Sequence, residues 1–258
     1  MAARSDLEMP TPGMDSARQI VSAVKDGRLK ESSVDACVDR MLEAVLTLTK
    51  DDVENGRKDK GDFDREGHHA LARKAARKSA VLLKNKENIL PLKPGTHVAL
   101  IGDFAFEPRY QGAGSSMVNV TKLDRMTDLI GEYDLVLEGA SRGYARSGEE
   151  DEVLSKEAVD LARSADVVIY CFGLDELSES EGIDRTHMRI PQNQISLLED
   201  ISRVNENVVG ILSAGAAVEM PWHHCLKGLL HGYLYGQAGA GAMLDIMTGK
   251  ENPSGRLS

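Results

Sequence analysis

The chain has 258 residues, of which 41% are hydrophobic and 28% are charged, as in ordinary globular proteins. A formal net charge of −10 argues against nucleic acid or an anionic membrane as the main partner. No apolar run is long enough to span a membrane, and the first ten residues lack the pattern of a signal peptide. The three cysteines lie far apart, without metal or disulfide spacing, so we expect reduced thiols, a cytoplasmic location and no metal or other cofactor.

Two helices are predicted within residues 14–49, because apolar side chains recur there at helical spacing. The apolar stripes are Ala17, Ile20, Val21 and Val24 in the first helix, and Val34, Val38, Met41, Leu42 and Val45 in the second. Two helices alone cannot bury both stripes, so residues 1–49 are interpreted as the end of a larger domain. Twelve of the twenty residues in 50–69 are charged, which is typical of a solvated linker. We therefore predict a domain boundary there and a second domain at 70–258.

From residue 70 onward, apolar runs alternate with helical patterns. The predicted strands are 97–102, 133–139, 166–173, 208–215 and 229–236, and the predicted helices are about 68–85, 122–131, 151–164, 192–204 and 238–248. Most of the runs are too apolar for strands with one face in water, which favours a parallel sheet covered on both faces. The alternation predicts an α/β fold, a three-layer α/β/α sandwich with a mostly parallel sheet and right-handed crossovers.

Three loops rich in glycine and polar residues follow predicted strands. They contain "YQGAGSS" at 110–116, "ESEGIDR" at 179–185 and "SAGAAVEMPW" at 213–222. Because ligands of open α/β sheets collect at the carboxyl ends of the strands, we expect these loops to converge on one rim. By itself, the second of these loops is also typical of a charged surface turn.

Several segments, in this order, resemble glycoside hydrolase family 3, and its β-glucosidases in particular. They are "DLEMP" (6–10), "AARKSAVLLKNKENILPL" (75–92), "YQGAGSS", "ESEGIDR", "IPQNQISLL" (190–198) and "GKENPSGRLS" (249–258). The resemblance covers nearly the whole chain. It implies the C-terminal α/β sandwich domain of that family, preceded by the last helices of its N-terminal (β/α)₈ barrel as a helical remnant.

The resemblance also implies a retaining hydrolysis of β-linked sugars by two carboxyl groups, one a nucleophile and one an acid/base. In the family the acid/base glutamate belongs to the sandwich domain, and Glu181 in "SEGIDR" is the matching position. Glu179, two residues earlier, is the alternative. Ser115 is the candidate for a hydrogen bond to a sugar hydroxyl. Asp184 and Arg185 are candidates for substrate binding or for holding the loop.

The chain departs from the family pattern at the barrel. A complete barrel takes about 250 residues, and the family's Ser-Asp-Trp nucleophile stretch does not occur here. We therefore expect a fragment of an exo-β-glycosidase that acts on a β-glucoside or related oligosaccharide, needs the barrel as a partner and has no turnover alone. Exposed apolar helix faces predict homodimerisation or limited solubility.

Two other functions were weighed against a glycosidase. A non-catalytic α/β carbohydrate-binding or scaffold module would have the same fold without a barrel. A nucleotide-binding protein is disfavoured, because neither "GAGSS" nor "GQAGAGA" has the spacing of a dinucleotide-binding loop. The histidines of "WHHC" (222–225) lack a third metal ligand nearby.

Overall fold

The computed structural model describes residues 5–9, 13–54 and 63–257, apart from the side chains of 51–53. It divides into two compact units, Met1–Phe63 (unit 1) and Asp64–Ser258 (unit 2). Unit 1 contains the two predicted helices, α1 (Met14–Lys25) and α2 (Glu31–Glu54). The charged stretch predicted as a linker begins inside α2 and ends inside α3 (Arg65–Ser79).

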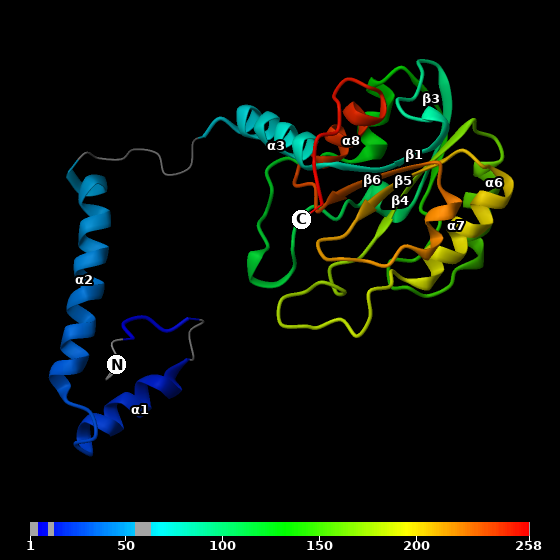
Figure 1. The fold of residues 1–258 in the computed structure, drawn as a ribbon. Helices are drawn as coiled ribbons and strands as arrows, with labels where there is room; N and C mark the ends of the chain where they lie inside the picture. The colour runs from blue at the N-terminus through cyan, green and yellow to red at the C-terminus, as the bar shows by residue number, and fades with distance from the viewer. Residues whose placement is uncertain (1–4, 10–12, 55–62, 258) are drawn as a thin grey trace. The chain divides into compact units, whose positions relative to one another are not determined.

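Unit 2 is built on a six-stranded sheet in the order β1-β6-β5-β4-β2-β3 (Figure 1). The strands are β1 (Val81–Asn85), β2 (Thr96–Ile101), β3 (Leu135–Ser141), β4 (Val167–Gly173), β5 (Val208–Ser213) and β6 (Gly228–Tyr233). All neighbouring pairs are parallel except β1 with β6, which is antiparallel. The predicted mostly parallel sheet is therefore confirmed, with β4 and β5 buried along their whole length.

Helices cover both faces of this sheet, as predicted (Figure 1). The remaining helices are α4 (Asp103–Phe106), α5 (Met126–Leu129), α6 (Glu152–Ala162), α7 (Gln192–Val204) and α8 (Gly239–Met247), with short 3₁₀ turns at Lys86–Asn88, Gly114–Ser116, Ile130–Glu132 and Pro221–Cys225. Alternate residues of β4 point into two separate cores. Ile169 packs with the core formed by α3, α5 and α8, whereas Tyr170 packs with the core formed by α6 and α7.

Three local predictions were wrong. The helix predicted at 68–85 ends at Ser79, and residues 81–85 form the edge strand β1, because their backbone pairs with β6. The helix predicted at 122–131 is reduced to α5 and a 3₁₀ turn. Strand β3 is not covered on both faces: it lies at the other edge of the sheet, and Val136 and Leu137 are exposed.

Two glycines allow the strands to end close together at the rim. Gly102 after β2 has φ +120°, and a Cβ there would lie 1.9 Å from the carbonyl oxygen of Cys171 on β4. Gly173 at the end of β4 has φ +145°, and its Cβ would lie 1.9 Å from the carbonyl oxygen of Ser213 on β5. Only glycine tolerates both the positive φ and this close backbone contact. The loops after β2, β4 and β5 therefore start side by side.

Candidate functional site

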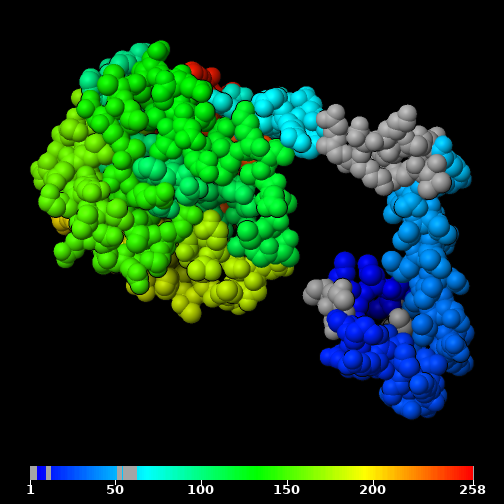
Figure 2. Space-filling view, turned by 180° about the vertical axis from the view of Figure 1, so that it is seen from behind, coloured from blue at the N-terminus to red at the C-terminus, as the bar shows by residue number. Residues whose placement is uncertain are grey.

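The loops after β2, β4 and β5 converge at the carboxyl edge of the sheet, as the strand order predicted. Ala113 and Ser180 form an isolated parallel bridge between the first two loops. The loop after β4 reaches the loop after β5 where Arg185 donates to the carbonyl of Ala217 at 2.7 Å and Glu219 N–H donates to Met188 O at 2.9 Å. Residues 107–125 (green) and 174–190 (yellow-green) meet at one end of unit 2 (Figure 2).

Glu181 lies exposed on this rim and contacts the loop after β2. Its Oε2 atom accepts hydrogen bonds from the backbone N–H of Ser115, at 3.1 Å, and from the Ser115 hydroxyl. The Ser115 hydroxyl, and then its N–H, hold the pKa of Glu181 below its ordinary value because they stabilise the carboxylate. Within the described parts of the chain, no hydrogen bond is made to Oε1. One oxygen of Glu181 is thus fixed and the other is free.

Glu179, only two residues away, has a different environment. Its carboxylate accepts hydrogen bonds from Gly215 N–H at 3.0 Å and from Ala216 N–H at 2.6 Å, both in the loop after β5. It also pairs with Arg109 at 3.2 Å, and its side chain is only 9% exposed. Both oxygens of Glu179 are therefore occupied by protein donors, and the residue joins loops together.

Asp184 and Arg185 lie on the same loop but differ in their contacts. Asp184 is exposed, and its carboxylate makes no hydrogen bond or ion pair to the residues that the structure describes. Arg185 is partly buried and binds Ala217 O through Nη2, while its buried Nη1 has no partner among the described atoms. Arg185 therefore holds the loop, and Asp184 stays open to solvent.

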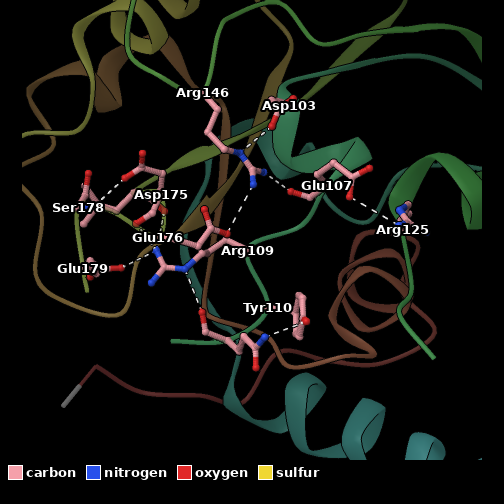
Figure 3. Close-up of polar contacts among 12 residues, drawn as sticks. Asp103, Glu107, Arg109, Tyr110, Arg125, Arg146, Asp175, Glu176, Ser178 and Glu179 are labelled. Carbon is pink, nitrogen blue, oxygen red and sulfur yellow. Dashed lines mark hydrogen bonds and ion pairs between the residues drawn. The ribbon is translucent and has the colours of Figure 1, made fainter. Parts of the chain in front are cut away.

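Sequence reasoning missed Arg109, the most buried charged side chain of the rim. The guanidinium points toward Glu179 and is 1% exposed (Figure 3). A second cluster missed in the sequence joins Arg146 to Asp103, at 2.8 Å, and to Glu176, at 3.5 Å (Figure 3). Single arginines in loops carry no spacing signal, so their burial becomes visible only in three dimensions.

The model of the glycosyl hydrolase family 3 C-terminal domain matches residues 80–258. The chain belongs to glycosyl hydrolase family 3. Over 98% of its length it is 43% identical to the thermostable beta-glucosidase B of Acetivibrio thermocellus, and it is 38% identical to an exo-alpha-(1->6)-L-arabinopyranosidase of Bifidobacterium breve. The crystal structure of the Bifidobacterium adolescentis GH3 beta-glucosidase matches 95% of the chain with a TM-score of 0.76 and 38% identity.

The chain spans about a third of these family 3 relatives: 33% and 34% of the two curated proteins and 35% of the crystallised one. The family match confirms the predicted resemblance and its α/β sandwich domain. Within the described residues, no group of three or more His, Cys, Asp or Glu side chains is placed to hold a metal ion. No described helix combines the length and apolar character that crossing a bilayer requires.

The contact between Ser115 and Glu181 gives a direct prediction for this family 3 domain. Replacing Ser115 by alanine removes the hydroxyl donor, so we expect the pKa of Glu181 to rise toward the ordinary glutamate value of about 4.3. The rise should be incomplete because the backbone N–H at position 115 remains. A ¹³C carboxyl NMR titration measures it, and a pKa that does not move would contradict the contact.

Proposed function

We propose that this chain supplies the acid/base side of a retaining exo-β-glycosidase site of the β-glucosidase type, with Glu181 as the acid/base. The observation that carries the proposal is the rim position of Glu181, with one oxygen held by Ser115 and the other free. A general acid must reach the leaving oxygen of its substrate, and the free Oε1 can do so. Glu179 cannot, because its oxygens already bind Arg109, Gly215 and Ala216.

The reaction takes two steps. In the first, Glu181 gives its proton to the glycosidic oxygen while a second carboxylate, about 5–5.5 Å away, attacks the anomeric carbon. In the second, Glu181 takes a proton from water, and the oxygen of that water replaces the enzyme carboxylate on the sugar. We infer that the second carboxylate belongs to a barrel outside this chain.

In this proposal the second carboxylate also sets the ionisation of Glu181. A general acid works best with a pKa near the working pH, yet Ser115 lowers the pKa of Glu181 in this chain. A nearby nucleophile carboxylate would raise it, because two negative charges at that distance disfavour each other. Docking of the barrel would therefore convert Glu181 from an ordinary surface carboxylate into an acid.

Ser115 and Asp184 complete the sugar-facing part of the proposal. The Ser115 hydroxyl has one hydrogen, which it donates to Glu181, so toward a sugar it can act only as an acceptor. Asp184 is exposed and can accept hydrogen bonds from sugar hydroxyls. Arg185 acts indirectly, by holding this loop against Ala217.

Unit 1 fits the last helices of the proposed barrel. Large apolar side chains on α1 and α2 remain exposed, among them Val21, Val38, Leu42, Val45 and Leu46. Exposed stripes of this kind mark a missing packing partner. We propose that the rest of the barrel covers them. A homodimer formed through these helices is the competing outcome, and sedimentation of the chain with and without a barrel separates the two.

The test of the proposed function is to replace the matching third of thermostable beta-glucosidase B with this chain. We expect the chimera to hydrolyse nitrophenyl β-D-glucoside and the chain alone to show no turnover. Parallel assays with nitrophenyl α-L-arabinopyranoside and nitrophenyl β-D-xyloside show which of the three sugars the chimera hydrolyses fastest. A folded chimera that is inactive on all three would favour a non-catalytic module, and turnover by the chain alone would refute the need for a barrel.

A further inference from the structure

Arg109 is a buried cation whose Nε and Nη1 atoms donate hydrogen bonds to two loops of the rim (Figure 3). Its Nε donates to Gln111 O, at 3.0 Å, in its own loop. Its Nη1 donates to Leu174 O at 3.0 Å and to Asp175 O at 2.5 Å, the first two residues after β4. A buried guanidinium is tolerated only when such partners replace water. Arg109 therefore fixes the start of the loop after β4.

Glu179 supplies the negative charge for Arg109 and extends the connection to a third loop. One of its oxygens is shared by Arg109 and Gly215 N–H, and the other is bound by Ala216 N–H at 2.6 Å. The loop after β4 is thus held at its start by the Leu174 and Asp175 carbonyls and five residues later by the Glu179 carboxylate. Breaking a largely buried pair of this kind leaves an uncompensated charge, so separating the two side chains is costly.

The fixed geometry ends directly beside the candidate acid/base. Ser180 follows Glu179 and bridges Ala113, and Glu181 then meets Ser115. Within the described residues, no charged group makes an ion pair with Glu181, whose hydrogen bonds come from Ser115. We propose that the Arg109–Glu179 pair is a positioning device that places Glu181 against Ser115. This inference rests on the proposed function of Glu181.

The physical reason lies in how loops lose their freedom. Ordering a residue of a free loop costs conformational entropy, and Glu181 is exposed and gains little from burial. The buried pair, two residues earlier, compensates for that ordering. Misplacement of a catalytic group by about 1 Å is enough to cost a large factor in rate. Arg109 and Glu179 thus hold the loop, and Glu181 stays accessible for proton transfer.

The test follows the ionisation of Glu181 by ¹³C carboxyl NMR in this chain and in Glu179→Gln. Removing the negative charge of Glu179 would by itself lower the pKa of Glu181, because a repelling neighbour disappears. Loss of the Ser115 contact raises it instead. We expect the pKa to rise toward the ordinary value, as in Ser115→Ala. The sign of the shift therefore separates positioning from simple electrostatics.

A second variant and a control protect this interpretation. Arg109→Lys keeps the positive charge but loses the planar guanidinium and its fixed set of donors. We expect this variant, like Glu179→Gln, to raise the pKa of Glu181. Tyr133→Phe is the control, because it removes a buried hydroxyl between α3 and α8 that donates to Asp245. We expect it to lower the melting temperature and to leave the pKa of Glu181 unchanged. A Glu181 pKa that falls or stays constant in both folded rim variants would overturn the proposal. If Glu181 is not the acid/base, the turnover of Glu181→Gln in the chimera shows it, whereas these pKa measurements test only the positioning. The failure of one proposal is therefore distinguishable from the failure of the other.

Discussion

Replacing Glu181 by glutamine in the chimera is expected to lower kcat/KM for an alkyl β-glucoside by roughly 10²–10⁴-fold. The alkoxide leaving group needs a proton as the glycosidic bond breaks, and glutamine has none to give. The effect should be much smaller on the first step with a dinitrophenyl glucoside, because that phenolate leaves without protonation. Steady-state and burst kinetics on the two substrates measure the difference.

Glu219→Gln is the matched control for this experiment. Glu219 lies in the loop after β5 and pairs only loosely with Arg189, at 3.7 Å. The change removes one rim carboxylate of the same type, so we expect wild-type rates on both substrates. Equal losses in Glu181→Gln for good and poor leaving groups would argue against proton donation. Full activity in Glu181→Gln would move the acid/base role to another carboxyl group.

Asp245→Asn is expected to lower the free energy of unfolding of unit 2 by about 3 kcal/mol at pH 7, the lower end of the cost of breaking a buried ion pair. Asp245 on α8 is 3% exposed. It accepts two hydrogen bonds at 2.8 Å from Arg73, and one each from Arg77 and Tyr133. The lower end applies because the two arginine side chains are 29% and 26% exposed, so water compensates in part. Urea denaturation measures the change.

The pH dependence of this effect has a defined direction. Burial raises the pKa of Asp245, but the hydrogen bonds from Arg73 and Tyr133 outweigh it and leave the pKa below its ordinary value. The stabilisation is therefore complete above the unfolded pKa of about 3.9 and is lost as the pH falls through the folded pKa. The difference between wild type and Asp245→Asn should shrink at pH 3.

An exposed pair provides the control for Asp245. Asp160 binds Lys156 one turn away on α6, and both side chains are more than half exposed. Solvent screens such pairs, so we expect Asp160→Asn to change the unfolding free energy by less than about 0.5 kcal/mol. If both variants lost a similar amount of unfolding free energy, the burial of Asp245 would not explain its contribution to stability.

The sequence by itself determined the architecture of unit 2. Runs such as 167–172 and 208–212 contain no charged residue and are rich in apolar side chains, which is typical of strands buried on both faces, and both lie in the centre of the sheet. The order of strands and helices then placed three loops at one edge. The family resemblance further pointed to Glu181 as the acid/base candidate, because its loop contains the sequence "ESEGIDR".

Only the tertiary structure decided between neighbours of the same chemical type. Glu179 and Glu181 are the same residue type two positions apart, yet one is largely buried against Arg109 and the other contacts Ser115 at the surface. Likewise, residues 81–85 became a strand because β6 lies beside them. Periodicity shows which face of a segment is apolar, whereas the partners of the two glutamates lie 36 to 70 residues away along the chain. The environment of a charge is set by such distant contacts, and no local pattern contains them.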